Sequence, residues 1–180
     1  MKQRRRTGLG RLNKGLASSP RQPGVIIRKA RPRDFESILK LISEQRKADG
    51  RQARASYQRD YIMNENSRDQ VWLASCAAQV VGVSGYWYDR YADNGVYWLG
   101  WTYVSQKHQH KGVGQKLLDR VLGEVEKRKA RKLYVDTSSA KMYEGALLFY
   151  IKNGFGIEGV FRNYYQRGED QIILGKELEP

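Results

Sequence analysis

Cysteine is almost absent from this sequence: Cys76 is the single one among 180 residues. One cysteine cannot form an intrachain disulfide, which excludes a disulfide-stabilised scaffold and is typical of a chain that works in a reducing compartment. The sequence also lacks a run of about 18 consecutive apolar residues, the length that a membrane-spanning helix needs, and a secretory hydrophobic segment. We therefore expect one folded domain that is cytoplasmic and has no membrane partner.

Acidic residues are missing from the first 33 positions, although the whole chain has a formal charge of +14. Eleven of the 33 Lys and Arg residues lie in that stretch. From Asp34 onward, 22 basic residues face 19 acidic ones, so the rest of the chain is nearly neutral. Clustered positive charge attracts nucleic acid or other anionic surfaces. Any such attraction should therefore come from the N-terminal segment.

Residues 1–24 also have few apolar side chains and no sustained periodicity. This composition predicts a flexible basic tail, followed by a folded domain over residues 25–180. Three roles fit the tail: a solvated segment without a specific partner, an arm that contacts nucleic acid weakly, and a peptide that targets an organelle. The sequence leaves all three open.

Hydrophobic periodicity predicts the elements of the domain, since alternation is typical of strands and spacings of three and four are typical of helices. The predicted strands cover residues 25–27, 71–74, 80–88, 96–104, 133–137, 160–166 and 171–174. The predicted helices begin at Pro32, at about Gln52 (running to Met63), after Gly112, and at Lys141 (running to Asn153). Gly154 should close the last helix, and Asp93-Asn94-Gly95 predicts a hairpin. Alternating helices and strands around one central hairpin favour a mixed α/β sheet.

The stretch that points most directly to chemistry lies between a predicted strand and an amphipathic helix, around Gly112 and Gly114. Glycines leave room for a ligand to approach the backbone, and the helix start behind them offers unpaired N–H groups and the positive end of the helix dipole. These features predict an anion site. Lys111 and Lys116 add positive charge, so a diphosphate is the expected occupant.

This run resembles the motif of the GNAT N-acetyltransferase superfamily, in which a Gln or Arg, two residues, a Gly, one residue and a Gly or Ala bind the pyrophosphate of acetyl-CoA. Gln109, Gly112 and Gly114 stand at those positions. Three more stretches are similar to that family and extend the match over residues 25–178: Ile27–Ala30 with Asp34, Gln79–Gly82, and Phe149–Phe155. A Rossmann or P-loop interpretation fails because the second half of either motif is missing.

The resemblance implies a mixed α+β fold with a central, mostly antiparallel twisted sheet of about six to seven strands and about four flanking helices. It also implies acetyl-CoA as co-substrate. The residues that it assigns to acetyl-CoA are Val104, Gln109, His110, Lys111, Gly112, Val113, Gly114 and Gln115. His108 and His110 lie inside this loop with no second ligand cluster nearby in sequence, so we expect no metal.

Acyl transfer from a thioester to an amine needs a neutral amine, donors for the developing oxyanion and a proton for the departing thiolate. A tyrosine hydroxyl, with a pKa of about 10, can supply that proton. The resemblance places Tyr150 at the family's general-acid position and implies that a backbone N–H near Val104 is the oxyanion donor. Because Tyr150 lies on an apolar helix face, a purely structural role in the core is the alternative.

Residues 98–103 contain no acid where many members of the family that this chain resembles have a Glu as general base. Water, Asp89, Asp136 and Glu144 are the candidates. Residues 136–139 also differ from the family, which commonly has an Asn there. Both departures leave the substrate side of the site open.

Two functions follow from this sequence. The first is an N-acetyltransferase that moves an acetyl group directly to a primary amine of a small molecule or a protein, without a covalent enzyme intermediate, because no activated cysteine is evident. The alternative is a catalytically silent acyl-CoA-binding module whose basic tail engages nucleic acid or an acidic partner.

Eight aromatic rings between Tyr86 and Tyr103 should alternate between the core and the opposite side. The outward half fits an acceptor pocket, a homodimer surface or ordinary sheet packing.

Overall fold

The computed structural model describes residues 24–60, 69–92 and 95–179. The predicted tail, apart from Gly24, lies outside the described residues, and so do residues 93–94 of the predicted hairpin. Within the described ranges, no helix combines the length and the apolar character needed to cross a membrane.

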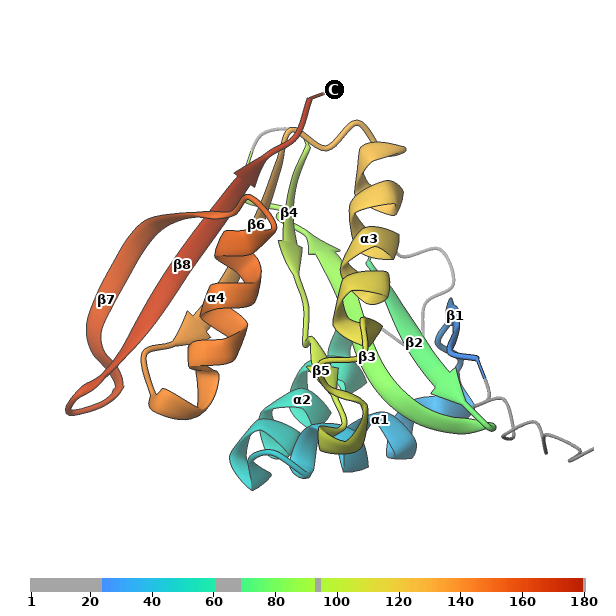
Figure 1. Ribbon diagram of the computed structural model, residues 1–180. Coiled ribbons are helices and arrows are strands. Elements are labelled where there is room, and N and C mark those ends of the chain that lie inside the picture. The colour runs from blue at the N-terminus through green and yellow to red at the C-terminus, as the bar shows by residue number, and fades with distance from the viewer. Residues whose placement is uncertain (1–23, 61–68, 93–94, 180) are drawn as a thin grey trace, which may run out of the picture.

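One mixed sheet organises the domain (Figure 1). Its strands are β1 (Ile26–Lys29), β2 (Gln70–Cys76), β3 (Gln79–Tyr88), β4 (Val96–Leu99), β5 (Tyr103–Val104), β6 (Lys132–Ser138), β7 (Gly156–Gln166) and β8 (Glu169–Glu177). The order is β1-β2-β3-β4-β6-β8-β7, and β5 pairs with β3 beside this path. Of the described pairs, β4–β6 is parallel and the others are antiparallel. The predicted mixed, mostly antiparallel sheet is thus confirmed.

Helices cover both faces of the sheet because alternate strand residues point to opposite sides. The described α-helices are α1 (Phe35–Ser43), α2 (Lys47–Asp60), α3 (Val113–Glu126) and α4 (Glu144–Lys152). Val83 of β3 packs in the cluster under α1 and α2, whereas Tyr86 of the same strand packs in the cluster under α3 and α4. The aromatic hairpin follows the same alternation: Tyr86 contacts Tyr97 edge to face, while Trp87 stacks on Trp98.

Helix α2 begins at Lys47, five residues before the predicted start. Its apolar pattern is weak: among the side chains of α2 that the structure describes, the buried apolar one is the small Ala53 and the other buried one is the carboxylate of Asp49. Periodicity cannot reveal a helix whose inner face is polar. The predicted end of this helix, Met63, lies outside the described residues.

The long strand predicted over residues 96–104 is wrong, because the segment forms two strands, β4 and β5, separated by Gly100–Thr102. Leu99 pairs with Tyr86 and Tyr103 with Val83, so the register along β3 shifts by one residue between them, as in a β-bulge. After the bulge, β5 stays paired with β3, whereas the pairing of β4 with β6 runs from Val96 to Trp98 and ends there. The two halves of the sheet therefore separate at this point.

The C-terminal third follows the prediction more closely. The segment from Lys141 begins as a 3₁₀ turn, η3 (Lys141–Tyr143), before α4. Gly154 closes α4 with a φ of +83°, and the following Phe155 is buried, so the predicted helix end is confirmed. Strands β7 and β8 are longer than predicted and form a hairpin at the edge of the sheet.

Candidate active site

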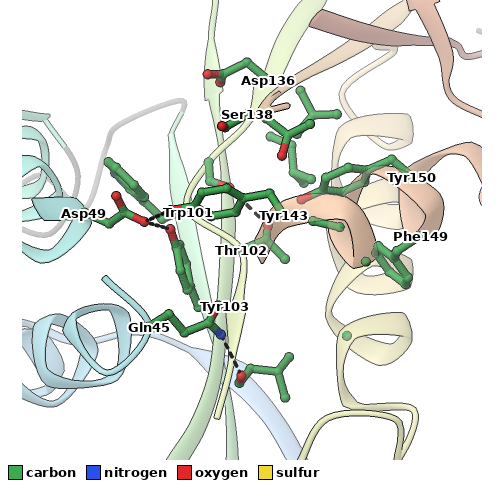
Figure 2. A pocket seen from close by; sticks show the side chains of 18 of the residues that line it. Gln45, Asp49, Trp101, Thr102, Tyr103, Asp136, Ser138, Tyr143, Phe149 and Tyr150 are labelled. Atoms are coloured by element: carbon green, nitrogen blue, oxygen red, sulfur yellow. Dashed lines mark hydrogen bonds between the residues drawn. The ribbon is translucent and has the colours of Figure 1, made fainter. Parts of the chain in front are cut away.

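A cleft of about 1510 Å³ lies where β5 and β6 separate (Figure 2). Its walls come from α2, the bulge between β4 and β5, the loop before α3, β6, η3 and α4. The bulge is held by a backbone hydrogen bond from the Gly100 N–H to the Gly85 carbonyl oxygen, at 2.8 Å. A side chain on Gly85 would collide with the backbone, since its Cβ would come within 2.5 Å of the Gln70 carbonyl oxygen. Direct backbone contacts of Gly85 with Gly100 and with Gln70 thus shape this wall of the cleft.

Six of the eight residues predicted for acetyl-CoA line the cleft: Val104, Gln109, His110, Gly112, Gly114 and Gln115. The other two do not. Val113 is 1% exposed and its side chain packs in the core beside Leu117. Lys111 is exposed outside the lining, and Lys116, also expected to add charge, borders a separate small groove beside Ile27. Because neither lysine lines the cleft, this arrangement favours an anion bound by backbone N–H groups over an anion bound by lysine side chains.

The loop before α3 has the conformation that an anion site needs. Gly112 has a φ of +76° and stands at the N-terminus of α3, where no described side chain accepts from the first-turn N–H groups. A Cβ on Gly112 would meet no described atom within 4 Å, so the space beside it is open. Gln109 fixes the start of the loop, because its Nε2 donates to the Val104 carbonyl oxygen at 3.0 Å. These features fit a pyrophosphate at the helix start.

Tyr150 is placed by α4 at the edge of this cleft. Its ring makes edge-to-face contacts with Phe149 and Phe155, and the residue is 5% exposed. Burial raises the pKa of the Tyr150 hydroxyl to about 12, although the nearby Thr102 hydroxyl opposes the shift and the Asp136 carboxylate adds to it. The hydroxyl is therefore protonated at neutral pH and borders the cleft, as a proton donor must.

The three acids proposed as general base occupy different places. Asp136 is exposed, lines the cleft and accepts hydrogen bonds from the Gln171 Nε2 at 2.9 Å and the Tyr165 hydroxyl at 3.2 Å. Neither Asp89 nor Glu144 is among the described residues that line the cleft.

Asp89 has a structural role in its own loop. Its carboxylate accepts from the Trp98 Nε1 at 2.9 Å and from two backbone N–H groups, those of Tyr91 and Ala92. Burial opposes the charged form of Asp89, but these hydrogen bonds outweigh it and lower its pKa. Asp136 is therefore the candidate acid that the structure brings to the cleft.

Sequence reasoning missed two acids that line the cleft, Asp69 and Asp49. Asp49 lies on α2. This residue is 7% exposed, and its Oδ2 accepts hydrogen bonds from the hydroxyls of Tyr103 and Tyr143, each at 2.5 Å. The Tyr143 hydroxyl thus directs its proton to Asp49. No signal in the sequence identifies Asp49, because its partners are 54 and 94 residues away.

The described ranges contain no group of three or more His, Cys, Asp or Glu residues that could hold a metal ion. His108 instead shares a hydrogen bond of 2.8 Å with the Ser105 hydroxyl through its Nδ1.

Comparison with known proteins gives consistent results. Residues 67–157, just over half of the chain, match the sequence profile of the GNAT acetyltransferase domain. No curated protein sequence matches the chain significantly.

Solved structures share the fold. A protein assigned to the GNAT acetyltransferases from Desulfovibrio desulfuricans is 24% identical, with a TM-score of 0.71 over 86% of this chain and 99% of that one. An aminoglycoside 6′-N-acetyltransferase in complex with coenzyme A is 17% identical, with a TM-score of 0.68 over 86% of this chain and 98% of that one. The ribosomal-protein-S18-alanine N-acetyltransferase from Escherichia coli is 18% identical, with a TM-score of 0.69 over 87% of this chain and 96% of that one.

Proposed function

Because the chain belongs to the GNAT acetyltransferase family, we propose that it transfers the acetyl group of acetyl-CoA directly to a primary amine. One observation carries the proposal: the uncapped start of α3 and the Tyr150 hydroxyl border the same cleft, at the point where the sheet separates. An anchor for a diphosphate and a protonated group for a leaving thiolate are the two requirements of this reaction on the acetyl-CoA side. Coenzyme A in the structure of the aminoglycoside N-acetyltransferase supports this choice of co-substrate.

The backbone around Gly112 fits the pyrophosphate of acetyl-CoA. The first-turn N–H groups of α3 donate toward negative charge, and the open space beside Gly112 admits the phosphates. Val113 turns its side chain into the core, so its backbone N–H can face the ligand. Gly114 would carry a Cβ only 3.8 Å from Val104 and Phe149, so a larger side chain there would narrow the cleft.

The residues of the chain then supply the proton transfers. Asp136, directly or through a water, accepts one proton from the acceptor ammonium, and the neutral amine nitrogen forms a bond to the acetyl carbon. The carbon–sulfur bond breaks, and the Tyr150 hydroxyl gives its proton to the departing thiolate. The amide nitrogen then releases its second proton, which returns to the Tyr150 oxygen directly or through a water, so that Asp136 holds the one proton that leaves for solvent. Burial raises the pKa of Tyr150 and would raise that of a thiol beside it, so the two groups stay comparable in acidity.

The acceptor side of the cleft favours a cationic amine with an apolar body. Aromatic residues line it together with three carboxylates, and rings of this kind bind cations through their faces. These residues are Trp87, Tyr88, Tyr91, Trp101, Tyr103, Tyr143, Tyr164 and Tyr165, with Asp49, Asp69 and Asp136. The names of the structural neighbours include acceptors of both expected classes, an aminoglycoside and a ribosomal protein.

The test is a turnover assay with acetyl-CoA and a panel of amines that contains aminoglycosides, small diamines and peptides with free N-termini. Release of free CoA that depends on one of these amines, with an acetylated product of the expected mass, is the expected result. CoA binding by calorimetry without transfer to any amine would instead favour the silent acyl-CoA-binding module. Absence of CoA binding would refute both hypotheses.

A further inference from the structure

The opening between β5 and β6 is bridged by one carboxylate. Asp49 accepts a hydrogen bond from Tyr103, which belongs to β5, and another from Tyr143, which belongs to η3 beyond β6 (Figure 2). In the described sheet, β5 pairs with β3 and not with β6, so these tyrosines stand on the two separate walls of the cleft. Asp49 therefore joins walls that the sheet itself no longer holds together.

Two residues directly before α2, Gln45 and Arg46, add contacts to the same two walls. The Arg46 guanidinium lies 3.3 Å from the Glu169 carboxylate, which belongs to β8 and is almost fully buried. Glu169 also accepts from the Ser138 hydroxyl, at 2.6 Å, at the end of β6. On the other wall, the Gln45 Nε2 donates to the Val104 carbonyl oxygen at 3.1 Å. The segment from Gln45 to Asp49 thus contacts both walls at four points.

The protonation states suit a permanent bridge. Burial and the Asp49 carboxylate both raise the pKa of Tyr103 and of Tyr143. Both hydroxyls therefore remain protonated donors throughout the neutral range, and the carboxylate is the acceptor. Hydrogen bonds to a carboxylate are stronger than hydrogen bonds between neutral groups. Loss of the Asp49 carboxylate would leave the two desolvated tyrosine hydroxyls without this hydrogen-bond acceptor.

Tyr103 of the bridge lies on the side of the sheet away from Tyr150. Tyr103 packs in the cluster under α1 and α2, whereas Tyr150 packs in the opposite cluster with residues of α3. The acceptor amine must reach the thioester from the side that the CoA chain leaves free. We propose that Asp49 is a positioning residue that holds Tyr103 and Tyr143 at a fixed separation and thereby determines which primary amines enter the acceptor side. This inference rests on the proposed acetyltransferase function.

The experiment uses the full chain with Asp49→Ala, Asp49→Asn and Tyr143→Phe, and with Arg54→Gln as the matched control. Arg54 lies on the same helix but pairs with exposed Glu36 away from the cleft. With the best amine of the panel, Asp49→Ala should raise the acceptor KM about tenfold or more and leave the acetyl-CoA Kd within about twofold. The amide oxygen of Asp49→Asn still accepts two hydrogen bonds, so this variant should recover most of the acceptor affinity.

Two results for Asp49→Ala would overturn the inference. One is an unchanged acceptor KM, and the other is weaker binding of both the acceptor and acetyl-CoA, which a general packing defect would cause. Should Asp49→Ala fail to fold, Tyr143→Phe decides, with an expected rise in acceptor KM of about threefold or more for one lost hydrogen bond; an unchanged value refutes the bridge. If the wild type acetylates no amine, the proposed function fails by itself. Hydrogen exchange at residues 141–152 then tests the bridge: faster exchange in Asp49→Ala supports it, and unchanged exchange refutes it.

Discussion

Replacement of Tyr150 by Phe separates a catalytic role from a structural one. The phenylalanine ring keeps the edge-to-face contacts with Phe149 and Phe155, whose centroids lie 5.5 and 5.7 Å from the ring of Tyr150. Only the hydroxyl is lost. Removal of one hydroxyl from a buried position changes the free energy of unfolding by about 1 kcal/mol, which corresponds to a melting-temperature change of about 2–4 °C in a domain of this size.

The expected effect on the rate is much larger. General acid–base catalysis contributes roughly 10²- to 10⁴-fold, so kcat should fall by at least about 10² in Tyr150→Phe while the acetyl-CoA Kd stays nearly constant. Free thiol released from CoA measures kcat, calorimetry measures the Kd, and thermal unfolding measures stability on the same preparation. Tyr97→Phe is the matched control, because Tyr97 is a buried tyrosine of the same core cluster that does not line the cleft.

The pH dependence of the wild type tests the same residue. A general acid loses activity as pH rises through its pKa, which for Tyr150 is raised by burial to about 12. The rate should therefore show no loss from this group up to about pH 11, whereas an unperturbed tyrosine, with a pKa of about 10, would already lose half its activity at pH 10. A folded Tyr150→Phe protein with full turnover would refute the assignment and leave a water as proton source.

Three further predictions concern the loop, the stability and the tail. Gly112→Val should weaken acetyl-CoA binding by more than about tenfold in calorimetry, because a β-branched residue is strained at a φ of +76° and fills the open space. Gly123→Ala, at a position of α3 outside the cleft where a Cβ meets no described atom within 4 Å, should leave the Kd unchanged. Asp34, whose pKa is lowered chiefly by the hydrogen bond from Arg28, should stabilise the fold above its unfolded pKa of about 4 and lose that contribution as pH falls through its lower folded pKa. Asp34→Asn should thus cost about 1 kcal/mol in denaturant unfolding at pH 7 and almost nothing near pH 2, and an equal cost at both pH values would contradict the ion-pair explanation. Removal of residues 1–24 should leave the acetyl-CoA Kd and the melting temperature unchanged and flatten the salt dependence of nucleic-acid retention; a truncated chain that fails to fold would show that the domain begins earlier.

Local sequence determined the parts of the site that depend on neighbouring residues. Gly112 and the apolar spacing after it predicted open backbone followed by a helix, and α3 begins at Val113 as expected. Gly154 likewise ended α4 where expected, which placed Tyr150 on its helix. Alternation along the aromatic hairpin also predicted that its rings divide between the core and the opposite side. Each of these features is decided within one or two turns of chain.

Tertiary structure alone decided the other wall of the cleft. An apolar run from Val96 to Val104 alternates like one strand, and the bulge in it depends on backbone contact between Gly100 and Gly85, which pairing with β3 creates. The burial of Asp49 has no local signal either. A carboxylate can be buried only where donors satisfy it, and its donors come from β5 and η3, far away in the chain. The hydrophobic periodicity of a sequence indicates which apolar side chains are buried. The hydrogen-bond partners of a buried carboxylate are determined only when segments that are distant in the chain pack together.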